Sequence, residues 1–210
     1  GIFAILAFDQ RGTYRRMLPA TISTYEEAAA LKQEIVVALA PYTTGVLLDA
    51  EYGFGAAMHM SGHVGLLMSL EKTGYSGDAT YRKLAFQEGW TVEKIKRMGA
   101  SAVKMMVYYH PDTGELADEL DEIVRQTVAE CHKYDLPMFL EPMSYSIDAA
   151  IDKSSPAFAE TRAHVVQETA RRLSATGADV LKLEFPLDVA LAYVFAQVER
   201  AQVSALYCGV

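Results

Sequence analysis

The sequence predicts an α/β protein and, within that class, a (β/α)8 barrel. Apolar strand segments alternate with helical segments along the 210 residues, a pattern typical of a parallel sheet covered by helices. Polar residues follow at least five of the strands, at the ends where barrel enzymes assemble their active sites. An open nucleotide-binding sheet is the disfavoured alternative, because Asp9-Gln10-Arg11-Gly12 follows the first strand in place of a glycine-rich phosphate loop.

The first half of the chain contains three predicted strands and three predicted helices. The helix over 24–40 is indicated by Ser23 or Thr24 as its cap, and Pro41 stops it. Thr91 can cap a later helix in the same way. The remaining elements are bounded by turn formers, and they are strands 2–8, 45–50 and 64–70, with helices 53–60 and 92–98.

The second half continues the alternation. A turn over 111–114 leads to a strongly amphipathic helix over 115–134, and Ser155 followed by Pro156 indicates the start of a helix that runs to about 175. Gly177 suits the left-handed position after that helix. An apolar strand follows Gly177, and Pro186 ends it. The other predicted elements are strands 101–108, 137–140 and 203–207 and a helix over 187–201.

Seven strands are visible, and the sequence stops where an eighth strand–helix unit would begin. Typical barrels have about 250 residues. A seven-stranded barrel would also leave two open parallel edges. We therefore expect a single barrel domain over 1–210 from which residues at both ends are omitted.

Composition excludes several classes of function. The formal net charge of −8 argues against a nucleic-acid partner, which usually requires a basic face. The apolar start of the chain is too short to span a bilayer and lacks a basic leader. Cys131 and Cys208 form neither a metal pattern nor a disulfide framework, and the five histidines show no ligand spacing. We expect a metal-free, cytoplasmic protein that does not bind membranes.

Two lysines occupy equivalent places in apolar strands. Gly99-Ala100-Ser101-Ala102-Val103-Lys104 repeats the spacing of Gly177-Ala178-Asp179-Val180-Leu181-Lys182. A lysine inside an apolar strand is costly unless it is paired, neutralised or used, although its stem can also snorkel to water. Alternate strands of a barrel fill one interior layer, so Lys104 and Lys182, on the fourth and sixth strands, are expected to lie close together.

Such a pair of lysines suits Schiff-base chemistry. Burial and mutual repulsion both lower a lysine pKa, and a neutral lysine can attack a carbonyl. The iminium that forms withdraws electrons, so that an adjacent carbon–carbon bond can break. Glu141 after the fifth strand and Asp9 after the first are candidate proton shuttles. Glu141 could instead neutralise a lysine by a salt bridge, and Asp9 could cap a loop.

Two further charged residues are candidates for contact with a substrate. Arg11 can bind a phosphate or hydroxyl group, or form a surface ion pair. Glu184 lies two residues beyond Lys182 on the same face, where it can orient the lysine or balance its charge.

Six motifs, in order over essentially the whole chain, resemble the class I tagatose 1,6-bisphosphate aldolases. They are Ala7-Phe8-Asp9-Gln10-Arg11-Gly12, Leu47-Leu48-Asp49-Ala50-Glu51-Tyr52-Gly53, Glu71-Lys72-Thr73-Gly74-Tyr75, Ala102-Val103-Lys104, Phe139-Leu140-Glu141 and Asp179-Val180-Leu181-Lys182-Leu183-Glu184. The resemblance implies a metal-independent barrel without a cofactor and a Schiff base on Lys182. It also implies supporting roles for Asp9, Lys104 and Glu141.

The implied reaction is reversible cleavage of a phosphorylated ketose, tagatose 1,6-bisphosphate, to dihydroxyacetone phosphate and glyceraldehyde 3-phosphate. Gln10 and Arg11 are the implied substrate-binding residues, with Gly209 in a loop that helps to hold a phosphate. That loop reads Tyr207-Cys208-Gly209-Val210 where the family has Ser-Ala-Gly-Val, and the Gly-Arg motif of an eighth strand is absent. A related branch acts on sulfofructose 1-phosphate. The alternative of another class is a catalytically silent barrel that binds sugar phosphates. Association of the chain into a homo-oligomer is a further expectation.

Overall fold

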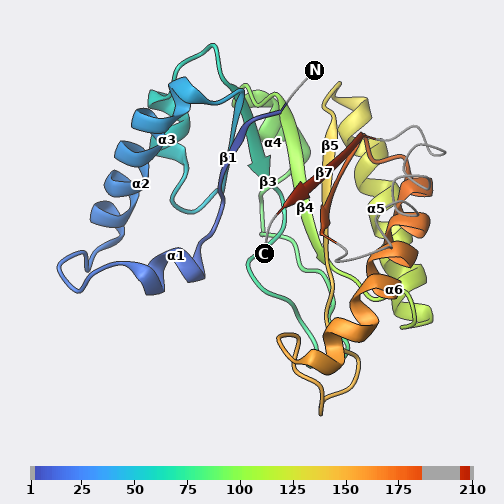
Figure 1. Cartoon of the computed structure of the whole chain (residues 1–210). Coiled ribbons are helices and arrows are strands. Elements are labelled where there is room, and N and C mark those ends of the chain that lie inside the picture. Colours follow the sequence, from blue (N-terminus) through green and yellow to red (C-terminus); the bar gives the residue numbers. More distant parts are fainter. Residues whose placement is uncertain (1–2, 186–203, 209–210) are drawn as a thin grey trace. The chain divides into compact units, whose positions relative to one another are not determined.

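The computed structural model describes residues 3–185 and the backbone of residues 204–208 (Figure 1). It confirms the predicted α/β class. Seven strands are hydrogen-bonded in the order of the sequence, as in a (β/α)8 barrel. Strand pairing is parallel between the first and second strands, the second and third, the third and fourth, the fifth and sixth, and the sixth and seventh. The strands are β1 Ile5–Phe8, β2 Gly45–Leu48, β3 Gly65–Ser69, β4 Ala102–Tyr108, β5 Met138–Met143, β6 Val180–Glu184 and β7 Ser204–Cys208.

The chain divides into two compact units. The first comprises Gly1–Thr73 and Gln87–Lys104, and the second comprises Gly74–Phe86 and Met105–Val210. Whether the chain is a single domain, as the sequence predicts, stays a prediction.

The first unit places β1, β2 and β3 in register, with Ile5 opposite Gly45 and Gly45 opposite Gly65. Its helices are α1 Gly12–Met17, α2 Tyr25–Leu39, α3 Phe54–His59 and α4 Val92–Arg97, with a 3-10 turn η1 at Ala40–Tyr42. The predicted start of α2 is confirmed, because Thr24 and Glu27 form a reciprocal capping box. The six-residue helix α1 was not predicted, since its sequence carries no side-chain cap.

The second unit contains β5, β6, β7 and two long helices, α5 Glu115–Lys133 and α6 Pro156–Leu173, with a 3-10 turn η2 at Ser174–Thr176. The Ser155 hydroxyl caps α6, and Gly177 adopts φ of 93° after it, so both predicted signals are confirmed. The predicted amphipathic pattern of α5 is confirmed by a buried stripe, which consists of Leu116, Ala117, Leu120, Asp121, Val124, Thr127, Val128 and Cys131.

The end of the fifth strand was predicted wrongly, and the first two strands are shorter than the predicted 2–8 and 45–50. The sequence placed Glu141 and Pro142 after the fifth strand, but β5 runs through both to Met143. Proline removes one backbone donor and leaves its own carbonyl and its neighbours able to pair. The Tyr109 N–H donates to the Met143 carbonyl at 3.0 Å, so hydrogen bonding continues beyond Pro142. The predicted helix over 187–201 lies outside the described residues.

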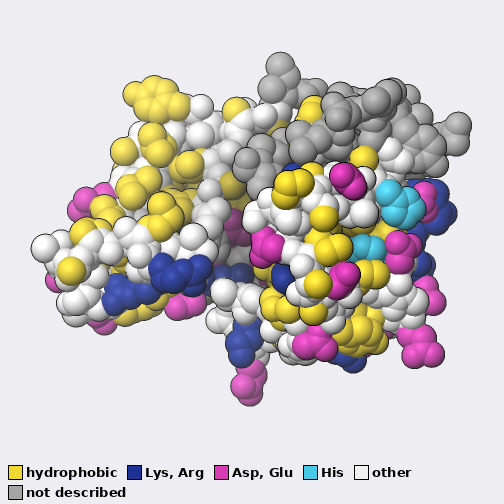
Figure 2. Space-filling view, turned by 60° about the horizontal axis from the view of Figure 1, so that its bottom comes forward, with side chains coloured by type: hydrophobic (Ala, Val, Ile, Leu, Met, Phe, Trp, Pro, Cys, Tyr) yellow, Lys and Arg dark blue, Asp and Glu magenta, His cyan; other side chains and the backbone are white. Residues whose placement is uncertain are grey.

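The surface mixes apolar and charged side chains. In Figure 2, hydrophobic side chains stand on the left, where Figure 1 places α1, α2 and α3, with basic side chains beside them. Exposed large apolar residues of the first unit include Met17, Tyr42 and Met58. Among the helices the structure describes, none combines the length and the hydropathy needed to cross a membrane.

Candidate active site

Lys182 pairs with Glu141 across two neighbouring strands. In the parallel register of β5 and β6, Leu140 lies opposite Leu181, so the next residue on each strand is a member of this pair. Lys182 Nζ lies 2.5 Å from Glu141 Oε1, and the two side chains are 16% and 10% exposed. Lys182 therefore reaches a largely buried carboxylate, and the alternative in which its amine points away toward water is wrong.

Glu184 has partners that the sequence did not predict. Its carboxylate accepts from the Ser144 backbone N–H at 2.8 Å and from Lys153 Nζ at 2.5 Å. Glu184 thus balances the charge of Lys153 and holds the segment that follows β5. Among the described residues, Lys182 donates to Glu141 and no hydrogen bond joins it to Glu184, so a direct orienting role for Glu184 stays a prediction.

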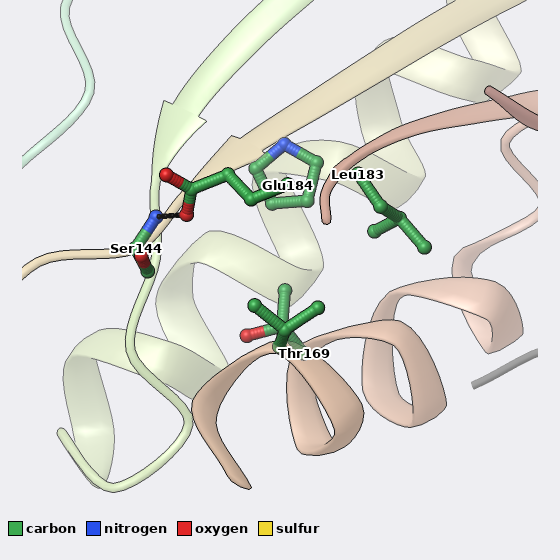
Figure 3. A pocket seen from close by; sticks show the side chains of 6 residues that line it. Ser144, Thr169, Leu183 and Glu184 are labelled. Atoms are coloured by element: carbon green, nitrogen blue, oxygen red, sulfur yellow. Dashed lines mark hydrogen bonds between the residues drawn. The ribbon is translucent and has the colours of Figure 1, made fainter. Parts of the chain in front are cut away.

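A small cavity lies behind this carboxylate, between β5, β6 and α6 (Figure 3). Its volume of about 10 Å³ is roughly the room that one water molecule needs. The hydroxyls of Ser144 and Thr169 line it, are buried and have no hydrogen-bond partner among the described atoms. In Figure 3 the Thr169 side chain rises from α6 toward Glu184, whose carboxylate reaches the Ser144 nitrogen.

Lys104 occupies a second cluster, in the first unit. It is buried, and its Nζ lies 2.7 Å from Asp9 Oδ2 and 3.4 Å from Glu71 Oε1. Asp9 thus binds a lysine, an arrangement that the loop-cap alternative does not require. Sequence reasoning did not select Glu71 as a site residue, although its position at the carboxyl end of β3 was a usable signal.

Arg11 joins the same cluster from the loop after β1. It donates to the Glu71 carbonyl at 2.8 Å and to Glu71 Oε1 at 3.3 Å. Because the side chains of Arg11 and Glu71 are 7% and 2% exposed, this is a buried ion pair, and the surface ion-pair alternative is wrong. Direct contact of Arg11 with a substrate stays a prediction.

A buried lysine that the sequence analysis missed supports the loop that carries Asp9. Lys32 Nζ donates to the carbonyls of Phe8 and Gln10, each at 2.9 Å, and lies 2.5 Å from Asp49 Oδ2. Burial lowers the pKa of Lys32, and Asp49 opposes that shift. A usable signal was its spacing, since Lys32 lies four residues from buried Ala28 and Val36 on one face of α2.

The remaining predicted residues are less informative. Gln10 is exposed, and it lines an apolar cavity of about 410 Å³ beside α1 and α2. Gly209 lies outside the described residues. Lys104 and Lys182 belong to different units, and their predicted proximity stays a prediction. Within residues 3–185, no group of three His, Cys, Asp or Glu side chains is arranged to hold a metal ion.

The pair in the second unit can perform proton-coupled nucleophilic chemistry. An ammonium that passes its proton to a neighbouring carboxylate becomes a nucleophilic amine, and the resulting acid can return the proton later. Because both side chains are mostly buried, the exchange is shielded from bulk water.

Comparisons with known proteins agree with this reading. Residues 3–208 match the family model described as "DeoC/LacD family aldolase". A protein named tagatose 1,6-diphosphate aldolase 2, from Streptococcus pyogenes serotype M3, is 37% identical over 205 residues. The alignment covers 95% of this chain and 62% of that relative, so the chain spans less than two thirds of the relative's length.

Solved structures share the fold. A Schiff-base-forming fructose-1,6-bisphosphate aldolase superposes with a TM-score of 0.63 at 20% identity, covering 97% of this chain and 73% of that chain. A triosephosphate isomerase from Bartonella henselae gives a TM-score of 0.55 at 17% identity, covering 99% and 83%. These likenesses confirm the predicted barrel class of fold.

Proposed function

This chain belongs to the DeoC/LacD family of aldolases, and from that premise we propose that it is a class I aldolase that forms a Schiff base on Lys182. The proposed substrate is a ketohexose 1,6-bisphosphate such as tagatose 1,6-bisphosphate. The products are dihydroxyacetone phosphate and glyceraldehyde 3-phosphate. The observation that carries the proposal is the contact of Lys182 with Glu141, and the name of the streptococcal relative supports the substrate class.

The reaction begins when Lys182 gives a proton to Glu141 and its neutral amine attacks the ketone carbon, C2. Glu141 then protonates the hydroxyl of the carbinolamine, which leaves as water and gives an iminium. A base removes the proton of the C4 hydroxyl, the bond between C3 and C4 breaks, and its electron pair moves into the iminium to form an enamine. Glyceraldehyde 3-phosphate leaves as the aldehyde. Protonation of the enamine at C3 and addition of water then release dihydroxyacetone phosphate and restore Lys182.

The cluster around Lys104 has a supporting role in this proposal. Asp9 and Glu71 hold the Lys104 ammonium, and we assign Asp9 as a candidate base for the C4 hydroxyl, in keeping with the family resemblance. Lys104 would stabilise negative charge that develops on substrate oxygen atoms. A cytoplasmic location and a homo-oligomeric state stay predictions from the sequence.

Reductive trapping tests the proposal directly. The protein is treated with sodium borohydride in the presence of dihydroxyacetone phosphate, and peptide mass spectrometry locates the adduct. We expect the adduct on Lys182, its loss in Lys182→Met, and no effect of a chelator on cleavage.

Two outcomes would contradict the proposal. An unmodified Lys182 together with intact cleavage would remove the Schiff base. Binding of sugar phosphates without turnover would favour the silent barrel, while faster cleavage of sulfofructose 1-phosphate than of the bisphosphate would move the protein to the sulfosugar branch.

A further inference from the structure

Arg82 is held by aromatic rings in place of an acid. Its guanidinium carbon lies 4.4 Å from the ring centre of Tyr75, 4.7 Å from that of Tyr108 and 5.1 Å from that of Tyr145. Such cation–π contacts hold a guanidinium without neutralising its charge. The described residues place no carboxylate within ion-pair distance of Arg82. Asp78, the acid nearest to it in sequence within its loop, accepts instead from the Thr80 N–H and hydroxyl, both at 2.7 Å.

The hydrogen-bond donors of Arg82 are mostly unused. Its Nε–H donates to the Ala79 carbonyl at 2.9 Å, and the described residues offer no hydrogen-bond acceptor to its other four N–H groups. The contacts with the rings do not use the N–H groups, so these planar donors stay available to a ligand. That geometry suits bidentate binding of a phosphate.

The position of Arg82 is set before any ligand arrives. Ser76 and Lys83 exchange two backbone hydrogen bonds, at 2.8 and 3.0 Å, and so close the loop that carries Arg82. Tyr145, which is fully buried, packs edge-on against Tyr108 with ring centres 6.5 Å apart. A donor held in this way loses little entropy when it binds a ligand.

Two of the three tyrosines around Arg82 lie at the carboxyl ends of strands. Tyr108 is the last residue of β4, and Tyr145 comes two residues after the end of β5. Tyr145 also follows Glu141 by four residues, which is at most about 14 Å of extended chain. Active sites of barrel enzymes are assembled at this end of the strands.

We propose that Arg82 is a specificity residue that binds the phosphate on C6 of the substrate. This inference rests on the proposed function. The C1 phosphate is attached next to the carbon that Lys182 attacks, whereas the C6 phosphate is the anionic group farthest from it. Arg82 packs against Tyr145, which follows Glu141 by four residues, so this cation is placed for the distant group, and it is the charge that a net acidic chain would need there.

The test compares wild type and variants of Arg82 on two substrates. Wild type and Arg82→Met are assayed on the 1,6-bisphosphate and on the 1-monophosphate of the same ketose, with Arg125→Met as the matched surface control. We expect Arg82→Met to lower kcat/KM for the bisphosphate by about 10- to 100-fold, the range for hydrogen bonds to a charged group, and to leave the monophosphate nearly unchanged. Arg82→Lys should recover part of the loss, since it restores the charge without the planar fork.

An equal loss on both substrates would overturn the proposal, because it would make Arg82 only an anchor for its loop. No loss on either would also overturn it. If wild type cleaves neither substrate, the proposed function fails, and calorimetric binding of the two ketose phosphates still decides the role of Arg82. Weaker binding of the bisphosphate alone by Arg82→Met supports the subsite, and unchanged binding refutes it. The 6-sulfonate analogue distinguishes a phosphate site from a sulfonate site by its relative kcat/KM.

Discussion

Replacing Lys32 by methionine should destabilise the first unit severely. The side chains of Lys32 and Asp49 are both 0% exposed, so the variant leaves a fully buried carboxylate without its cation. It also leaves the carbonyls of Phe8 and Gln10 without their shared donor. Breaking one side of a buried ion pair costs about 3–5 kcal/mol. Since whole domains are stable by about 5–15 kcal/mol, this loss is a large fraction of the total.

Urea unfolding measures the effect. With a slope of about 2 kcal/mol per molar urea, the midpoint should fall by about 2 M. The matched control is Lys133→Met, whose pair with Glu130 is exposed and should contribute about 0–1 kcal/mol. In Lys32→Met/Asp49→Asn the buried charge is gone while an amide oxygen can still accept from the N–H groups of Glu51 and Tyr52, so about half of the loss should return. A midpoint for Lys32→Met within 0.5 M of wild type would refute this reasoning, where about 0.5 M is the shift of 1 kcal/mol.

Three further predictions concern the second unit. Glu141→Gln keeps the shape of the site but removes its acid, so kcat for cleavage should fall by about 100- to 10,000-fold. Circular dichroism should show unchanged folding. Near-normal turnover would exclude Glu141 as the proton shuttle. Thr169→Val replaces a buried hydroxyl, which has no hydrogen-bond partner among the described atoms, by a methyl group. Thermal unfolding should therefore show no loss of stability. A loss above about 1 kcal/mol would mean that the hydroxyl is hydrogen-bonded to water in solution. Burial lowers the pKa of His110, against an opposing effect of Asp112, so the unfolded chain takes up a proton first as pH falls below about 6.5 and stability should drop there. His110→Gln should lose that pH-dependent part in urea unfolding measured between pH 8 and 5, and an unchanged profile would contradict the assignment.

Local signals in the sequence determined most of the elements. Helix α2 begins where Thr24 and Glu27 can cap it, and α6 ends just before the turn that closes at Gly177, because caps and left-handed glycines act within a few residues. Sequence selected both Lys182 and Glu141 as candidates but left open which lysine Glu141 would meet, and the register of β5 and β6 placed it beside Lys182. The local signal failed at Pro142, which was expected to lie beyond the end of β5 but lies inside the strand. Whether a proline ends a strand depends on which backbone groups need hydrogen-bond partners at that position.

The tertiary structure alone decided which charges are compensated. Lys32 meets Asp49 from 17 residues away, and Lys104 meets Asp9 from 95 residues away. The sequence around each lysine does not indicate which acid it will pair with, because long-range pairs depend on strand register and on how helices pack against the sheet. The same is true of Arg82, which looks like an ordinary loop arginine until three tyrosines from separate segments surround it. The sequence thus located the amine and the acid of the proposed chemistry. The packing determined that Arg82 has no carboxylate within ion-pair distance among the described residues, because an ion pair forms only where the fold brings its two members within reach.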